Sequence, residues 1–509
     1  MKTLALLALL LVPQDETLRL QLRSRAETAP GSGRWHAVTR PASWEARKTA
    51  VVVCDMWDKH WCAGATARVA EMAPRMNETV AALRKKGALV IHCPSATLDF
   101  YKDTPQRKLA QAAPKIVGKF SIQPWRKLDP SREAPLPIDD SDGGCDDQPP
   151  CKQGKAWSRQ IESIRIEEGD AITDSAEAYY LMRERGIENV LVMGVHTNMC
   201  VLGRPFSIRQ LVVLGLNVAL VRDLTDTMYN SRMRPEASHF TGTDLVVEHI
   251  EKYWCPSTTS ADILGGAPFR FKDDKRPHLA MVIAEDEYKT WETLPPYALE
   301  RLGKDFRIST VFGNEKSLND LPGIEVLAEA DVALFSVRRR VLPKAQLEVV
   351  RKYVASGRPV VAIRTSSHAF SPRQGKAPEG HEAWPEFDPE VLGGHYTGHH
   401  GAPKPGGPRV LAWTVAEKHP ILAGIPSGEF ALTSSLYKAS PLAPGATPLL
   451  MGRVEGVEKA EPVAWTFVRK DGGRTFYASP GGPDDFKLEA FARLLSNGIR
   501  WAAGLPVSD

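Results

Sequence analysis

The sequence predicts an α/β protein of two doubly wound domains, each a three-layer α/β/α sandwich. Short apolar runs alternate with helical patterns in both halves of the chain, and this order places helices on both faces of a mostly parallel sheet. A chain of 509 residues is also too long for one ordinary core. Residues 256–277 have the composition of a linker. We therefore expect one domain at 34–255 and a second at 278–505.

The first residues differ in composition from the rest. Met1 and Lys2 precede the apolar run TLALLALLLV, which is too short to span a bilayer but fits the central region of a secretory signal. We expect residues 1–17 to be a signal peptide and the protein to be secreted or periplasmic. The alternative is an N-terminal core helix.

The overall composition is that of a soluble globular protein, with 25% charged and 43% hydrophobic residues and a formal net charge of +4. Such a charge gives no sign of a nucleic-acid partner, and a homo-oligomer stays open. All seven cysteines precede residue 256. Cys145 and Cys151 flank the polar segment DDQPP, and we expect them to pair as a disulfide in an oxidising compartment.

The elements of the first half follow in order. Continuous apolar runs predict strands that are covered on both faces, as in a parallel sheet. The predicted strands are TAVVVCD (49–55), ALVIHCP (88–94), NVLVMG (189–194) and NVALVRD (217–223). The predicted helices are 65–87, 177–186, 205–215 and 243–253. Residues 101–160 lack periodicity, and a loop of that length commonly shapes a functional site.

The second half repeats this alternation. Its predicted strands are HLAMVIAED (278–286), DVALFSV (331–337), PVVAIRT (359–365), PVAWTFV (462–468) and GGRTFYASPGG (472–482), and its main helices are 344–357 and 486–504. An irregular region rich in Gly and His lies between the third and fourth of these strands.

Cys200 is the first candidate functional residue. It lies in GVHTNMCV, where a buried strand turns into a predicted helix, and the positive end of a helix dipole favours a thiolate and an oxyanion. Asp55 ends the first strand, and ligands of doubly wound sheets bind beyond the carboxyl ends of the strands. Asp55 can therefore carry the thiol proton. The alternatives are an inert buried cysteine and an aspartate that caps a turn.

The segments VVVCDMWDKHWC and GVHTNMCV resemble the isochorismatase-like cysteine hydrolases, the superfamily of nicotinamidases and related amidases, over about residues 50–255. The resemblance implies that Asp55 and Cys200 are two members of an Asp–Lys–Cys triad. It also implies a cis peptide bond between Val195 and His196.

The triad lysine is the departure from the family. Counting back from Cys200 puts Glu167 near its place. A second carboxylate there predicts a raised pKa for the Cys200 thiol. Either Lys59, Lys152 or Lys155 supplies the missing positive charge, or the chemistry has changed or been lost.

Further residues near the two motifs are candidates for substrate binding. They are Trp57, Lys59, His60, Trp61, His196 and Arg204. The two tryptophans are equally compatible with a core position. His92 and Asp99 do not reproduce the metal-ligand spacing of nicotinamidases, so we expect no metal and no cofactor.

The second half resembles the trehalose-utilisation (ThuA-like) domain, which is related in fold to the class I glutamine amidotransferases. The matching pieces include KYVASGRPVVAIRTSSHAF, LGGHYTGHH and EKHPILAGI. This half contains no cysteine, which excludes cysteine-based glutaminase chemistry.

Several residues in this half bear on its role. His368, His395, His399 and His400 indicate either a metal or sugar site or a hydrogen-bonded surface. Ser435 stands in a position that is often acidic in such domains, and Gly481-Gly482 stands where Gly-His is common. These departures favour a non-catalytic role in carbohydrate binding.

The sequence therefore predicts a hydrolase of a small amide or a related C–N or ester bond, with Cys200 as the nucleophile. The alternative is a catalytically weakened protein that binds a small molecule or a sugar on two retained folds.

Overall fold

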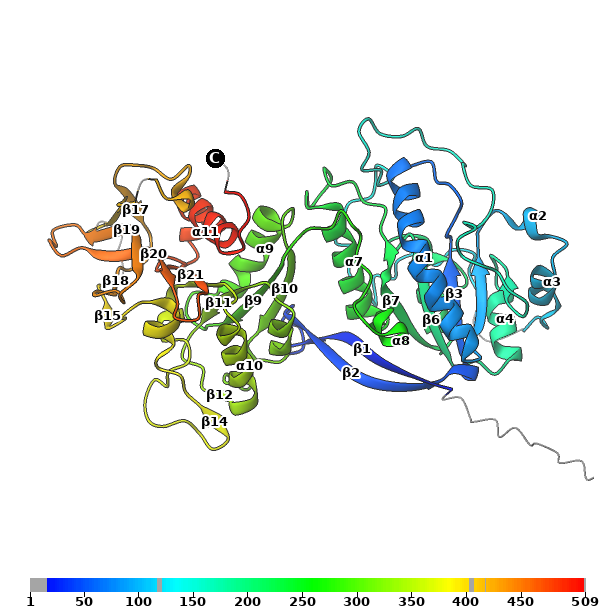
Figure 1. Cartoon of the computed structure of the whole chain (residues 1–509), viewed down its shortest axis with the longest axis horizontal. Coiled ribbons are helices and arrows are strands. Elements are labelled where there is room, and N and C mark those ends of the chain that lie inside the picture. Colours follow the sequence, from blue (N-terminus) through cyan, green and yellow to red (C-terminus); the bar gives the residue numbers. More distant parts are fainter. Residues whose placement is uncertain (1–15, 117–120, 402–406, 417, 508–509) are drawn as a thin grey trace, which may run out of the picture. The chain divides into compact units, whose positions relative to one another are not determined.

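The computed structural model describes residues 16–116, 121–401, 407–416 and 418–507 (Figure 1). Within these ranges the chain forms two compact units. The first contains the residues up to 24, 39–235 and 242–274, and the second contains 25–38, 236–241 and those from 275 onward. Both units are α/β, as predicted.

The first unit contains an eight-stranded sheet among its described residues, in the order β2-β1-β8-β7-β6-β3-β4-β5. The strands from β8 to β5 are parallel to one another, and β1 is antiparallel to β8. The strands are β1 (Thr17–Glu27), β2 (Trp35–Glu45), β3 (Thr49–Cys54), β4 (Leu89–Cys93), β5 (Ala171–Ile172), β6 (Asn189–Val195), β7 (Asn217–Asp226) and β8 (Ser257–Thr258).

Helices connect these strands as a doubly wound sheet requires. They are η1 (Ala46–Lys48), α1 (Ala63–Lys85), α2 (Leu98–Tyr101), α3 (Pro105–Ala112), α4 (Glu177–Glu184), α5 (Cys200–Gly203), α6 (Ile208–Val213), α7 (His239–Tyr253) and α8 (Ala261–Leu264). The central strand β3 is fully buried. Its side chains Ala50, Val52 and Cys54 share one core cluster with apolar residues of α4 and α6, because alternate side chains of a strand point to the same face.

The second unit contains a nine-stranded sheet in the order β10-β9-β11-β13-β21-β20-β19-β16-β17. The strands β10 to β21 are parallel, whereas β20, β19, β16 and β17 continue the sheet antiparallel. They are β9 (His278–Ala284), β10 (Arg307–Phe312), β11 (Val332–Val337), β13 (Val360–Ile363), β16 (Val410–Thr414), β17 (Phe430–Leu432), β19 (Ala446–Val454), β20 (Glu461–Val468) and β21 (Arg474–Ala478).

Short pairs and helices complete this unit. The strand β12 (Leu342–Pro343) pairs with β14 (His381–Glu382), and β15 (Gly398–His399) pairs with β18 (Tyr437–Lys438). The helical segments are α9 (Thr290–Leu302), η2 (Ile324–Ala328), α10 (Lys344–Ala355), η3 (Arg364–His368), η4 (Phe387–Leu392), η5 (Pro420–Leu422), η6 (Asp485–Lys487) and α11 (Glu489–Ala502).

Two sequence predictions differ from the structure. The expected linker 256–277 is largely folded into the first unit, because β8 joins its sheet and Asp223 binds the backbone N–H groups of Ser260 and Phe269. The expected helix 205–215 is interrupted, since α5 ends at Gly203 and α6 begins only at Ile208.

The predicted signal peptide lies outside the described residues, apart from Glu16 and Thr17. In the part of the chain that the structure describes, no helix has both the length and the apolar character that a membrane span needs.

Candidate functional site

Asp55 and Cys200 meet at the carboxyl ends of two neighbouring parallel strands. Asp55 follows β3 directly, and β3 pairs with β6 along its whole length. Beyond β6 the chain turns through residues 196–199, and Cys200 opens α5. The peptide bond between Val195 and His196 is cis, as the resemblance implies. Asp55 has a φ of 48°, a left-handed conformation that is uncommon for non-glycine residues and that clusters at functional sites.

The carboxylate of Asp55 is completely buried. One oxygen, Oδ1, accepts the backbone N–H of Ser95 at 2.7 Å. The other, Oδ2, lies 3.6 Å from Nε of Arg204, and the carboxylate also interacts with the Cys200 thiol. Burial raises the pKa of Asp55, although Arg204, Cys200 and Ser95 oppose that rise. A carboxylate with a raised pKa is a suitable acceptor for the proton of a thiol.

The Cys200 side chain is 8% exposed. Burial raises the pKa of its thiol well above the ordinary value, Asp55 raises it further, and Arg204 lowers it. The dipole of α5 lowers the pKa of this thiol less than the sequence indicates, because the helix has only four residues. The direction of the shift agrees with the sequence prediction, but its causes are burial and Asp55.

Arg204 is the cation of this site. Its guanidinium interacts with both Asp55 and Cys200, and its side chain is 28% exposed. The indole of Trp125, from the long 101–160 segment, lies 5.5 Å from the guanidinium carbon. Backbone contact reinforces this arrangement, because Arg126 donates its N–H to the carbonyl of Gly203 at 2.7 Å. Arg204 therefore supplies a positive charge where the family resemblance implies a lysine.

The structure does not bring Glu167 to Cys200. Its side chain is exposed on a turn before β5, where its backbone N–H binds Asp170. The carboxyl end of β5, which β3 and β4 separate from β6 in the sheet, carries Thr173 and Asp174 instead, and Asp174 accepts the backbone N–H of Ala96. Counting back along the sequence from Cys200 did not locate the end of β5, because a strand of only two residues leaves no pattern in the sequence.

The three alternative lysines are exposed. Lys155 donates to the carbonyl of Ala96 at 2.8 Å, next to the Ser95 that binds Asp55. Arg204 is the cation with the largest effect on the pKa of Cys200 and of Asp55.

Aromatic rings gather beside this site. Trp57 and Trp157 stack with centroids 4.6 Å apart, and His60 stacks on Trp157 at 5.6 Å. His196 meets His60 edge-on at 5.0 Å. Burial and Arg68 lower the pKa of His60 to about 4, so this ring is neutral near pH 7. Trp57 packs in the same core cluster as Cys200.

The two tryptophans of the first motif have different roles. Trp57 is buried, and its indole N–H donates to the carbonyl of Ser95 at 3.1 Å. It therefore helps to hold the loop that binds Asp55. Trp61 packs with Cys62, Cys145 and Met228 in a separate cluster.

Sequence reasoning missed Ser95, Trp125 and Trp157. The two tryptophans lie in the aperiodic 101–160 segment, and large aromatic residues in a polar loop were the available signal. Ser95 gave no signal, because it acts through its backbone N–H.

The predicted disulfide is absent, since Cys145 and Cys151 are free. Both sulfurs lie near the same oxygen of Asp147 instead. The histidine and the aspartate considered as metal ligands differ in burial. The ring nitrogens of buried His92 lie 3.0 Å from Oε1 of Gln160 and 3.1 Å from Oδ2 of Asp170, whereas Asp99 is exposed.

The second unit has a polar cleft of about 230 Å³. It is lined by Glu287, Tyr288, Arg338, Arg339, His368, Arg373, Tyr396, His399 and Tyr437. His368 and His399 therefore belong to it, whereas His395 is exposed and is not among the lining residues. Burial and neighbouring arginines lower the pKa of His368 to about 3.

Three residues with left-handed backbone conformations flank this cleft. Lys289, Arg339 and Arg364 have φ values of 51°, 48° and 49°, and they follow the neighbouring parallel strands β9, β11 and β13. Such conformations cluster at ligand-binding sites. Arg364 occupies the turn after β13, where an amidotransferase would carry its cysteine.

Arg364 is buried, and both terminal nitrogens of its guanidinium donate hydrogen bonds. Its guanidinium donates to the carbonyl and the hydroxyl of Ser435, at 2.8 and 2.7 Å. It also lies over the rings of Tyr288 and Tyr437, at 4.6 and 4.3 Å. Ser435 thus binds a guanidinium from the position that is often acidic. The Gly481 and Gly482 N–H groups both donate to Asp485.

The fold and the sites define an α/β protein of two units. The first unit has a cysteine, a carboxylate and a guanidinium at the carboxyl ends of its strands, and the second unit has an arginine-rich cleft. Residues 281–502 match the family model ThuA, described as trehalose utilisation. The second unit therefore carries a ThuA domain. The comparison with curated proteins gave no match.

Solved structures similar to parts of the chain fall into two groups. A ThuA-like protein from Bacteroides uniformis ATCC 8492 is 20% identical, covering 47% of this chain and 95% of that chain, with a TM-score of 0.34. A cysteine hydrolase from Pseudomonas syringae pv. phaseolicola 1448A is 16% identical, covering 43% and 92%, with a TM-score of 0.28. N-carbamoylsarcosine amidase from Thermoplasma acidophilum is 12% identical, covering 42% and 96%, with a TM-score of 0.24.

Proposed function

We propose that the first unit hydrolyses a small amide or a related C–N or ester bond, with Cys200 as the nucleophile and Asp55 as the proton carrier. The observation that supports this proposal is a buried thiol and a buried carboxylate that shift each other's pKa at the ends of neighbouring strands, beside one guanidinium. A nucleophile close to a base, with a third group orienting the base, is the arrangement that covalent catalysis requires.

The reaction has two halves. The Cys200 thiol gives its proton to Asp55 while the sulfur attacks the carbonyl carbon, and the oxyanion forms near the Cys200 backbone N–H, which has no partner within its helix. Asp55 then protonates the leaving amine or alcohol, and a thioester remains on Cys200. Asp55 next takes a proton from water, which attacks the thioester and releases the acid and the thiol. Arg204 stabilises the anionic states of both groups.

A substitution at the nucleophile tests this function. We expect Cys200→Ser to lower turnover by about a thousandfold or more, because a hydroxyl is a far weaker nucleophile than a thiolate. Cys255→Ser is the matched control, since Cys255 is a buried cysteine outside the site. The measurement is release of ammonia, amine or alcohol from a library of small amides, carbamoyl compounds and esters. Mass spectrometry of the Cys200 peptide should show the thioester.

The alternative is a protein that binds a small molecule without turning it over. The raised pKa of Cys200 favours this alternative, because it leaves little thiolate near neutral pH. Library compounds that raise the melting temperature of the first unit but give no product and no thioester would support binding and contradict hydrolysis.

For the second unit, we propose that the cleft binds a carbohydrate that carries an acidic group. Three arginines and the rings of Tyr288, Tyr396 and Tyr437 line it. Guanidinium groups bind carboxylates and phosphates in a bidentate manner. No cysteine is available there for amide hydrolysis.

Exposed Arg373 provides the test of this cleft. We expect Arg373→Ala to weaken binding of a sugar phosphate or a uronic acid by about tenfold, which is the cost of one lost charge-assisted hydrogen bond. The control is Arg409→Ala, because Arg409 pairs with Glu455 and does not line the cleft. Titration calorimetry measures both variants. Equal affinity of wild type and Arg373→Ala, or a preference for neutral sugars, would contradict the proposal.

A further inference from the structure

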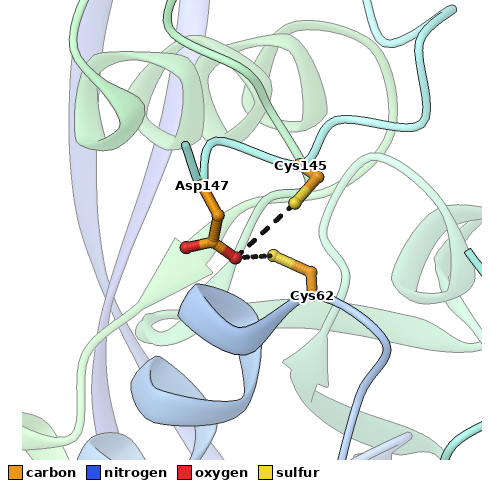
Figure 2. Close-up of side chains that lie close together, drawn as sticks. All are labelled: Cys62, Cys145 and Asp147. Carbon is orange, nitrogen blue, oxygen red and sulfur yellow. Dashed lines mark hydrogen bonds between the residues drawn. The ribbon is translucent and has the colours of Figure 1, made fainter. Parts of the chain in front are cut away.

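A second cluster of thiols lies at the start of α1, apart from Cys200. Figure 2 shows the side chains of Cys62, Cys145 and Asp147 converging on one point. Oδ2 of Asp147 lies 3.2 Å from the sulfur of Cys62 and 3.6 Å from that of Cys145. The sulfur of Cys151 lies 3.2 Å from the same oxygen. One carboxylate oxygen is thus surrounded by three thiols from two separate segments of the chain.

The first three backbone N–H groups of α1 all point at this cluster. Ala63 donates to the sulfur of Cys151 at 3.5 Å, and Ala65 donates to that of Cys62 at 3.4 Å. Gly64 donates to Oδ2 of Asp147 at 2.9 Å. These donors and the helix dipole stabilise negative charge on the sulfur and oxygen atoms. The start of this 23-residue helix therefore favours the charged form of the sulfurs, whereas burial and Asp147 raise the pKa of the Cys62 thiol, so that a cation is needed to hold the thiolates.

We propose that Cys62, Cys145, Cys151 and Asp147 bind one Zn²⁺ ion. Three thiolates and one carboxylate form a four-coordinate ligand set of the kind that zinc prefers. Zn–S and Zn–O distances of about 2.3 and 2.0 Å place sulfur and oxygen about 3.5 Å apart in a tetrahedron, close to the observed 3.2 to 3.6 Å. The ligand atoms of Cys62, Cys145 and Asp147 all lie within 4.8 Å of one another, and the sulfur of Cys151, which is outside this group, must move closer to complete the set when the ion binds.

Binding requires only acid–base chemistry. Each of the three thiols loses its proton to the buffer as its sulfur bonds to the ion, and no electron is transferred. The resulting site carries a net charge of −2, which the helix amides and the nearby guanidinium of Arg68 offset. Cys62 and Cys145 are 1% and 4% exposed. A closed site with four protein ligands is structural, because no position is left for a substrate.

The site would tie the 145–151 segment to the loop before α1. That loop carries Trp57 and His60, and Cys62 is the N-cap of the helix. Zinc would therefore hold the aromatic rings beside Cys200 in place. The metal site itself does not depend on the proposed hydrolysis, because its evidence lies entirely in these four side chains.

Metal content tests the proposal directly. The full chain is reduced, incubated with Zn²⁺, freed of excess metal and analysed by mass spectrometry for bound zinc. We expect one zinc per chain, and at least a tenfold loss of affinity in both Cys145→Ser and Asp147→Ala. Cys255→Ser is the control and should keep the metal. Substitution by Co²⁺ should give the thiolate charge-transfer and visible bands of a tetrahedral site, which Cys151→Ser would change.

Three results would overturn the proposal. One is a reduced, folded protein that takes up no zinc and whose cluster thiols react equally fast with and without Zn²⁺. The second is zinc binding that survives in Cys145→Ser and Asp147→Ala. The third is a Cys145–Cys151 disulfide that persists in the natively isolated protein and blocks zinc uptake.

Discussion

Replacing Arg204 with methionine should shift the alkylation of Cys200 to higher pH by about one unit or more. The guanidinium is the group that lowers the pKa of this thiol, against burial and Asp55, which raise it. Two charges about 4 Å apart in a partly buried setting interact by about 4 kcal/mol. The 28% exposure of Arg204 reduces that value, and one pKa unit is about 1.4 kcal/mol. The rate of carbamidomethylation at the Cys200 peptide, followed from pH 7 to 11, measures the shift.

Two further variants make this test specific. Arg204→Lys keeps the charge and should stay close to the wild-type profile. Asp55→Asn removes a negative charge beside the thiol and should move the profile to lower pH. If Arg204→Met folds and its profile coincides with that of wild type, the guanidinium does not act on Cys200. Loss of the cation should also destabilise the first unit by about 2 kcal/mol, less than for a fully buried ion pair.

Asp388→Asn should stabilise the second unit by about 4 kcal/mol above pH 8 and have little effect near pH 4. Burial raises the pKa of Asp388 to about 7, only partly opposed by the Tyr396 N–H that its carboxylate accepts. The unfolded carboxyl titrates near 4. The native state therefore holds a proton that the unfolded state has lost between these values, and stability falls as pH rises from about 4 to 7. Asparagine resembles the protonated acid and removes this loss.

Urea unfolding of wild type and Asp388→Asn at pH 4.5 and 8.5 measures the difference. The control is Asp484→Asn, because Asp484 is exposed and pairs only with Lys487 at the surface. A constant stability difference between Asp388→Asn and wild type across this range would show that Asp388 stays ionised, or stays protonated, throughout.

The fold was predictable from the sequence because its central strands are buried on both faces. Residues 50–54 and 190–195 are apolar throughout, and a short run of that kind is typical of a parallel strand that is covered on both faces. The short strands β5 and β8 were not predictable, because two residues are too few to form a pattern. For this reason the sequence predicts a linker after residue 256, although the segment is folded.

The site was predictable where a residue comes soon after a strong strand. Asp55 directly follows β3, and Cys200 follows β6 after the turn of residues 196–199. The role of Arg204 as the cation was not predictable, because the resemblance assigns the positive charge to a lysine far from the cysteine motif. Arg204, which the sequence marks only as a candidate for substrate binding, lies four positions after the cysteine, on the break between α5 and α6. The thiol cluster was partly visible, since Cys145 and Cys151 were paired in the prediction, but the approach of Cys62 depends on the fold.

Each unit is built from segments that are not continuous in the sequence, and this limits how the chain can be divided into fragments for separate expression. Residues 25–38 and 236–241 belong to the second unit, although both precede the residue at which its main part begins. Arg34 lies over the ring of Trp291 at 4.9 Å, and Ser238 binds the carbonyl of Gly303 at 3.1 Å. A gene fragment that starts at residue 275 would encode the matched domain without these partners. Shuffling or expressing the two halves as consecutive modules would therefore separate pieces that fold together.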